Sequence, residues 1–228
     1  MRKKYIVQPV GWRDMKREEQ KIWVLGDLHL GQYVMHNGQH AFIRRKPGYE
    51  KRLFTAWDYS VRGSDVVVLL GNVTTAKERG KRMRPLKWFE RIKEMPGHKI
   101  LCLGNQERNR PSWYERFGFG MVVPFNEALT APLPDRGPLP AGYVMFSHLP
   151  AYASVLTNEH DQTYKGLCYK LGRYYDRTSA MLNVHAHTLG RGMERYQTID
   201  AGLDAVGVDG PVSLDQLIES KYSLGSKK

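Results

Sequence analysis

The sequence is poor in cysteine and has no long hydrophobic run. Cys102 and Cys168 are its only cysteines among 228 residues, too few for a disulfide framework, so we expect a reducing, cytoplasmic environment. No apolar run approaches the roughly 20 residues that span a bilayer. The basic N-terminus also lacks the continuous apolar segment of a secretory signal. We therefore expect no membrane association.

Negative charge is also scarce. Lys and Arg number 35 against 23 Asp and Glu, which gives a formal net charge of +12. Such an excess attracts polyanions and steers acidic ligands toward the protein. The basic residues are spread along the chain, however, and no known DNA- or RNA-binding motif accompanies them. The charge leaves open a merely solvated basic surface, a phosphorylated small molecule or a nucleic acid.

Repeats and low-complexity segments are absent, and the length suits one α/β domain with a buried core. We expect an N-terminal arm over 1–20 and the domain over 21–228. Apolar runs predict strands at 22–25, 66–70, 99–103, 143–147, 181–184 and 196–199. Helices are expected at 49–62, 77–95, 111–119 and 211–220, the last with Ser213 as its N-cap. The remaining segments are expected to be a polar loop after His29, a proline-rich loop over 124–140 with an extended edge, and a lid with a helical piece over 157–178.

Polar side chains follow five of the expected strands, at the point where each strand ends. These side chains are Asp27 and His29, then Asn72, Asn105 and His148, and finally His185 and His187. Any one of them suits a turn, but five such ends in succession are hard to attribute to turns. Ligands in open α/β sheets bind beyond the carboxyl ends of the strands. A set of this size, made of carboxylate, amide and imidazole groups, is enough for two adjacent metal ions.

The ordered motifs resemble those of the calcineurin-like metallophosphoesterase superfamily. They read GDLH (26–29), GN (71–72), GNQE (104–107), SH (147–148) and VHAH (184–187). The family pattern is D-x-H, G-D, G-N-H-D/E, H and G-H-x-H, and the chain is similar to the small phosphoesterases of bacteria and phages. The resemblance runs from about Ile22 to Ser220. It implies a four-layer α/β/β/α sandwich of two mixed sheets flanked by helices, with the site at the carboxyl ends of the strands.

The resemblance also implies a metal centre and a reaction. Asp27, His29 and His187 would hold one divalent ion, Asn105, His148 and His185 the other, and position 72 would bridge them. Manganese is favoured, with iron, nickel, zinc or magnesium as alternatives. A metal-activated water would hydrolyse a phosphomonoester or phosphodiester. The positive charge favours a nucleotide or a nucleic-acid end.

Further residues are expected to act on the substrate. Gln106 stands where many family members have a His that stabilises or protonates the leaving oxygen, and we expect it to act with Asn105 and His148. Arginine suits bidentate contacts with oxyanions, so three arginines are candidates to grip phosphate. These are Arg44, Arg45 and Arg108.

Two positions depart from the family pattern. Asn72 stands in place of Asp, and an amide bridges two cations poorly and cancels none of their charge. We therefore expect weaker binding of one or both ions. Gln106 can donate a hydrogen bond but cannot transfer a proton. Three interpretations stay open: an active enzyme with altered metal preference, a natural pseudoenzyme that serves as a binding or scaffold protein, and an enzyme silenced by near-isosteric substitutions.

Overall fold

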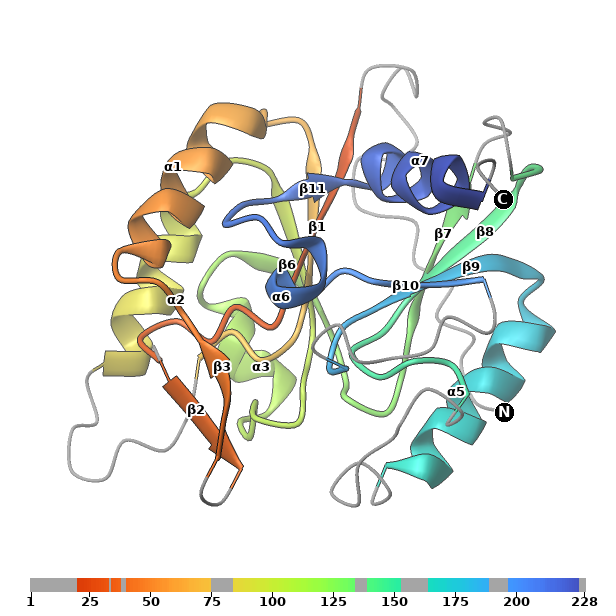
Figure 1. Ribbon diagram of the computed structural model, residues 1–228, viewed down its shortest axis with the longest axis horizontal. Helices are drawn as coiled ribbons and strands as arrows, with labels where there is room; N and C mark the ends of the chain where they lie inside the picture. Colours follow the sequence, from red (N-terminus) through yellow and green to blue (C-terminus); the bar gives the residue numbers. More distant parts are fainter. Residues whose placement is uncertain are drawn as a thin grey trace.

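Two mixed sheets form the centre of the molecule (Figure 1). The computed structural model describes residues 20–32, 34–37, 40–74, 84–133, 139–152, 164–188 and 197–225. The five-stranded sheet has the order β11-β1-β4-β5-β6, with β11 antiparallel to its neighbour and the other strands parallel. The four-stranded sheet has the order β10-β9-β8-β7, with β7 antiparallel. Strands β2 and β3 pair separately as an antiparallel hairpin.

The elements have the following bounds. The strands are β1 Ile22–Gly26, β2 Val34–Asn37, β3 His40–Arg44, β4 Val66–Leu70, β5 His98–Cys102, β6 Phe119–Val123, β7 Leu129–Leu133, β8 Gly142–Phe146, β9 Ala180–His185, β10 Thr198–Asp200 and β11 Val212–Ser213. The helices are α1 Tyr49–Ser60, α2 Arg84–Glu94, α3 Pro111–Glu115, α5 Lys165–Arg177, α6 Leu203–Val206 and α7 Leu214–Gly225.

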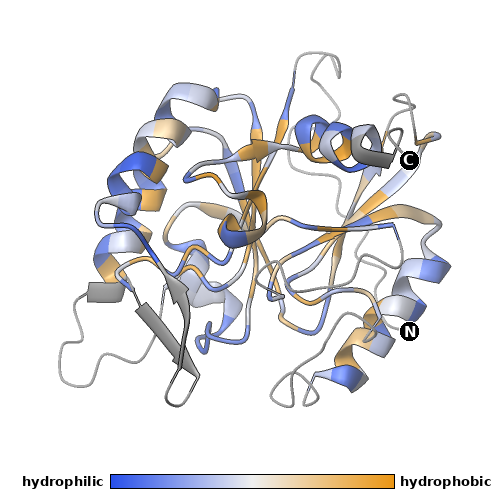
Figure 2. Cartoon of the chain, viewed as in Figure 1, coloured by the Kyte–Doolittle hydropathy of each residue, from blue (hydrophilic) through white to orange (hydrophobic). Residues whose placement is uncertain are grey.

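Strand β4 shows why these sequences form central strands. Its residues VVVLL are all buried, as expected for a parallel strand covered on both faces. Val67 and Leu69 belong to the apolar cluster that includes residues of α1, α2 and α3. Val68 and Leu70 alternate with them and belong to the cluster between the two sheets. Hydrophobic residues accordingly concentrate in the central strands (Figure 2).

The apolar clusters define four layers. Helices α1, α2 and α3 cover the outer face of the five-stranded sheet, and the second cluster fills the space between the sheets. On the outer face of the four-stranded sheet, Cys168 and Leu171 of α5 pack against Met145. The expected four-layer α/β/β/α sandwich of two mixed sheets is confirmed. No helix in the described ranges is both long and apolar enough to cross a membrane.

Most of the expected elements are present. Helix α7 has the expected N-cap, Ser213. Ser213 Oγ accepts a hydrogen bond from Gln216 N, and Gln216 Oε1 accepts one from Ser213 N. This reciprocal pair is a capping box at the start of α7. The extended edge in the proline-rich segment is β7, and the helical piece of the expected lid is α5. The N-terminal arm, except Gln20, and the beginning of the helix expected at 77–95 lie outside the described residues.

The expectation of a polar loop after His29 was wrong, because β2 and β3 form a hairpin there. The sequence signal was Asn37-Gly38 between two short segments that contain apolar residues, since Asn-Gly is a preferred turn of two-residue hairpins. The helix expected at 111–119 is also too long. It ends at Glu115, and Gly118 adopts a left-handed φ of 79° before β6 begins at Phe119.

Candidate metal centre

The parallel strands β1, β4 and β5 end at the same edge of the sheet, and their following loops run side by side. Backbone hydrogen bonds join Asp27 N to Gly71 O at 3.2 Å and His29 N to Asn72 O at 2.8 Å. Extended pairing therefore continues, in part, beyond the last strand residues. This continuation holds Asp27, His29 and Asn72 beside one another.

Gly71 is required where the two sheets meet. Its φ is 73°, and a Cβ there would lie 2.5 Å from Gly104 Cα and 2.8 Å from His148 Nδ1. His148 follows β8 of the second sheet, and its Nδ1 is 2.7 Å from Leu70 O at the end of β4. The glycine thus permits a contact in which a histidine of one sheet docks on a strand end of the other.

Several non-glycine residues at this edge of the sheet have left-handed backbone conformations. Asp27, His29, Asn72 and His187 have φ values of 50°, 47°, 51° and 71°. Left-handed conformations cost a non-glycine residue about 1–2 kcal/mol, although Asn, Asp and His tolerate them better than most. Non-glycine residues held in such conformations cluster at functional sites. Four of the seven expected metal ligands fall in this class.

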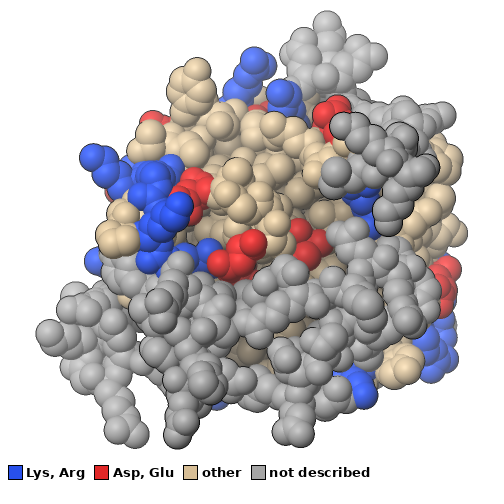
Figure 3. Space-filling view, in the orientation of Figure 1, with Lys and Arg blue, Asp and Glu red and all other residues tan. Residues whose placement is uncertain are grey.

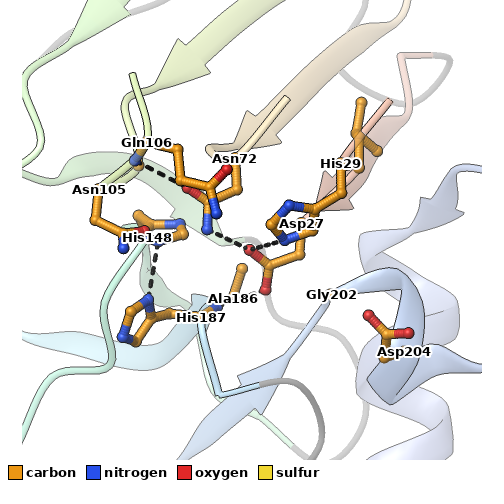
Figure 4. A network of polar contacts seen from close by, with 12 residues as sticks. Asp27, His29, Asn72, Asn105, Gln106, His148, Ala186, His187, Gly202 and Asp204 are labelled. Atoms are coloured by element: carbon orange, nitrogen blue, oxygen red, sulfur yellow. Dashed lines mark hydrogen bonds and ion pairs between the residues drawn. The ribbon is translucent and has the colours of Figure 1, made fainter. Parts of the chain in front are cut away.

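Asp27 and Asn72 make direct contact (Figure 4). Asn72 Nδ2 donates to Asp27 Oδ1 at 3.0 Å, and Asn72 Oδ1 accepts from the backbone N–H of Gln106 at 3.2 Å. Asp27 Oδ2 accepts from the backbone N–H of His187 at 2.8 Å. His29 Nε2 lies 3.7 Å from Asp27 Oδ1. Each amide and carboxylate group is therefore oriented by a defined partner, and the N–H side of Asn72 faces the carboxylate.

A second group of donors surrounds His148. Its Nε2 lies 3.2 Å from Asn105 Oδ1 and 3.1 Å from His187 Nδ1. The carbonyl of Leu70 accepts from Nδ1, which places the ring proton on Nδ1 and leaves a lone pair on Nε2. His185 Nδ1 is likewise 2.9 Å from Ala186 O. Imidazoles fixed in this way by backbone carbonyls are typical of metal ligands.

Burial governs the protonation of these groups. It raises the pKa of Asp27 to about 7, and the nearby charge of Asp200 adds to the increase. It lowers the pKa of His29 to about 3, with the charge of Arg45 as the next cause. The pKa of His148 is also held well below its usual value, chiefly by burial. The two imidazoles are therefore neutral near pH 7, the form that binds a metal ion.

The donor chemistry fits divalent cations, although the arrangement is incomplete. Within the described ranges, no three His, Cys, Asp or Glu side chains are grouped closely enough to hold an ion. The carbonyl oxygens of Asn72 and Asn105 are further oxygen donors. His29 Nδ1 is buried and has no hydrogen-bond partner among the described residues. Buried oxygen and imidazole donors of this kind suit manganese, iron, nickel or zinc.

The remaining expected residues differ in their surroundings. The side-chain oxygen of Gln106 is buried, and no described residue bonds to it. Arg45 is buried, donating to Asp204 Oδ1 at 2.8 Å and to Asp27 O at 2.7 Å, and its phosphate-binding role stays a prediction. Arg108 is exposed, and the side chain of Arg44 lies outside the described residues.

Sequence reasoning placed Tyr164 in the expected lid but did not predict that Tyr164 and Phe125 contact the histidines of this site. The ring of Tyr164 packs edge-on against His187 with centroids 5.2 Å apart, and Phe125 lies 5.8 Å from His148. Tyr164 Oη also accepts from Asn105 Nδ2 at 3.4 Å. No motif marks these residues, since each comes from a segment without a regular pattern. Sequence reasoning also assigned no role to Glu107, the last residue of GNQE. Its carboxylate accepts hydrogen bonds from backbone N–H groups of the loops that follow β4 and β5.

The fold and this edge define an α/β sandwich protein whose strand ends deliver polar side chains from both sheets. No protein-family model matches the chain. The chain is 26% identical over 200 residues to the gene 66 protein of Mycobacterium phage D29, covering 81% of this chain and 88% of that protein. It is 29% identical over 198 residues to the gene 66 protein of Mycobacterium phage L5, covering 81% and 87%.

A solved structure shares the fold. It is the crystal structure of a protein of unknown function from Aquifex aeolicus, with a TM-score of 0.61 and 17% sequence identity. The similarity covers 89% of this chain and 100% of that one. At this level of identity the likeness supports the architecture alone.

Proposed function

We propose that this chain is a metal-dependent phosphoesterase of the calcineurin-like type that acts on a phosphomonoester or phosphodiester. The observation that carries the proposal is the convergence of Asp27, Asn72, Asn105, His148 and His187 through contacts of 2.8–3.2 Å. These residues come from five strand ends in two sheets. Structural turns alone would not require a neutral imidazole fixed by a backbone carbonyl, amide oxygens and a buried carboxylate at one place.

The proposed centre divides into two halves. Asp27, His29 and His187 would hold one divalent ion, Asn105, His148 and His185 the other, and Asn72 lies between the two groups. When bound, such ions supply Lewis acidity toward phosphoryl oxygens and lower the pKa of water. His148 stays neutral because it is buried. Gln106 can offer its amide N–H groups to the leaving oxygen but has no proton to transfer.

The surface charge supports a phosphorylated substrate. The net charge of +12 attracts anions, and a nucleotide or nucleic-acid end is the substrate class that we favour. Lys and Arg side chains gather over α1 on the face shown in Figure 3, where Lys51 is exposed and the exposed Arg52 forms an ion pair with Asp209 at 2.7 Å. This basic surface would raise the local concentration of phosphate-bearing ligands.

A second candidate function is a non-catalytic binding protein on the same fold. One contact favours it: the N–H side of Asn72 faces Asp27 Oδ1 at 3.0 Å. An N–H donor cannot ligate a cation, and it partly balances the Asp27 carboxylate without one. In this case the basic surface would hold an anionic partner and no hydrolysis would follow.

Hydrolysis of aryl phosphates separates the two functions. The chain and its Asn72→Asp variant are assayed with an aryl phosphomonoester and an aryl phosphodiester, with and without Mn²⁺. Gln197→Glu is the matched control, since it makes the same amide-to-carboxylate change at an exposed position where β10 begins. Manganese-dependent hydrolysis by the unchanged chain supports the phosphoesterase. Activity in Asn72→Asp alone supports the binding protein, and no activity in either chain refutes the phosphoesterase.

A further inference from the structure

One half-buried carboxylate joins the ends of β4 and β5. Glu107 Oε2 accepts hydrogen bonds from Asn72 N at 2.8 Å and from Gly104 N at 2.7 Å. Glu107 Oε1 accepts a third from Val73 N at 2.8 Å. Three backbone N–H groups from two loops therefore converge on a single side chain.

These N–H groups take the place of a positive counter-charge. Burial raises the pKa of Glu107, and the backbone donors act in the opposite direction. Within the described ranges, no Lys or Arg forms an ion pair with it. Successive backbone amides form concave sites that bind anions. Here the chain's own carboxylate fills such a site, so the loops are fixed to each other and not to an outside ligand.

The residues fixed in this way adjoin the candidate metal centre. Asn72 has a left-handed φ of 51°, which its backbone contact with Glu107 helps to hold. Asn105 follows Gly104 directly, so the hydrogen bond that Gly104 N donates to Glu107 also restrains the backbone position of Asn105. A Cβ at Gly104 would lie 2.6 Å from Asn72 Oδ1 and 2.9 Å from Glu107 Oε2. The two loops are so close that displacing one displaces the other.

We propose that Glu107 is a positioning residue of the candidate metal centre, because it links Asn72 and Gly104 and so fixes where Asn72 and Asn105 present their side chains. It acts through backbone N–H groups, not by contact with a substrate. The part of this inference that concerns metal binding rests on the proposed function. The part that concerns the two loops stands on the hydrogen bonds alone.

Glu107→Gln tests the inference, and Asp65→Asn is its matched control. Asp65 is buried, and its carboxylate also accepts three hydrogen bonds, from Lys21 N, Trp23 Nε1 and Arg62 N. It lies where β4 begins, at the opposite edge of the same sheet. Both variants exchange one carboxylate oxygen for an NH₂ group that cannot accept, so both are expected to lower the melting temperature. Only Glu107→Gln should alter the edge that carries the site.

Two measurements distinguish a positioning role from a general loss of stability. The first is hydrogen–deuterium exchange in the metal-free protein, where Glu107→Gln should accelerate exchange at one or more of the Asn72, Val73 and Gly104 amides. The second is Mn²⁺ affinity by calorimetry, where Glu107→Gln should weaken binding about tenfold or more, as for other residues that orient ligands. Asp65→Asn should change neither.

The outcomes separate this inference from the proposed function. Unchanged exchange at all three amides overturns the inference, as does an equal loss of Mn²⁺ affinity in both variants. If the unchanged chain binds no Mn²⁺, the proposed function fails, and amide exchange alone then decides whether Glu107 fixes the loops. If Glu107→Gln does not fold, Glu107→Asp replaces it in both measurements, since it keeps the charge but is one methylene shorter.

Discussion

Asn72→Asp replaces an N–H donor with a second negatively charged oxygen beside Asp27. The structure places the two side-chain atoms 3.0 Å apart. Two unit charges about 3 Å apart repel by roughly 5 kcal/mol at an effective dielectric constant of about 20. The lost hydrogen bond to a charged acceptor adds about 1.5–3 kcal/mol. Proton uptake by the pair relieves part of the repulsion, so we expect a net loss of about 2–4 kcal/mol in the metal-free variant.

Thermal unfolding measures this loss. For a chain of this size, 1 kcal/mol corresponds to about 2–4 °C, so the metal-free variant should melt about 4–16 °C below the unchanged chain. A divalent cation removes the repulsion, and Mn²⁺ should restore the melting temperature. Calorimetry should show one more bound ion than in the unchanged chain, because a carboxylate can give an oxygen to each of two ions.

Gln197→Glu controls for the added charge and should show neither the loss nor the rescue. A metal-free Asn72→Asp chain that melts with the unchanged chain and gains no Mn²⁺ affinity would refute the bridging argument. It would mean that position 72 does not face a shared cation site.

Three further predictions concern other parts of the structure. Gly71→Ala should lower the free energy of unfolding, measured by chemical denaturation, by more than about 3 kcal/mol, because its Cβ would meet Gly104 Cα at 2.5 Å. Gly207 has a similar φ of 71° but no atom within 4 Å, so Gly207→Ala should cost about 1–2 kcal/mol. Equal losses would contradict the close-approach argument. Burial raises the pKa of Cys102 to about 12, so a thiol reagent at pH 8 should label it only at the rate of unfolding. The free energy of unfolding should fall as pH rises above about 8.5, where the thiol of the unfolded chain ionises. Rapid labelling of the folded protein would contradict this prediction. Arg45→Lys should lower both the melting temperature and the Mn²⁺ affinity, because lysine loses the two-pronged contact with Asp204 and the Asp27 carbonyl. Arg108 is exposed, so Arg108→Gln should leave the melting temperature unchanged and raise KM for a phosphodiester. A raised KM with unchanged stability for Arg45→Lys would instead support direct contact between Arg45 and phosphate.

The strands that carry the candidate site were predictable because their sequences leave little choice. Val66–Leu70 is apolar and mostly β-branched, and a glycine with a polar residue follows it. The same order recurs after β1 and β5. Parallel strands place their carboxyl ends together, so the sequence order alone predicts that Asp27, Asn72 and Asn105 lie close to one another.

The contacts within the site were not predictable in the same way. Whether the amide of Asn72 turns its oxygen or its nitrogen toward Asp27 depends on the N–H of Gln106, which occupies the oxygen side. The burial of Arg45 depends on Asp204, a residue 159 positions away along the chain. The suitability of arginine for bidentate oxyanion contacts made Arg45 a candidate to bind phosphate, and only the folded structure shows the partner that holds it inside.

The hydrogen bond between His187 N and Asp27 Oδ2 spans 160 positions of the chain. During synthesis at about 5–20 residues per second, Asp27 is added to the chain roughly 8–30 seconds before His187. Closing so long a loop is entropically costly, so this contact belongs to a late stage of folding. Nascent chains that stop before β9 would lack His185 and His187, one expected ligand from each half of the proposed centre, and should not capture a cation, whatever local structure their first sheet has reached.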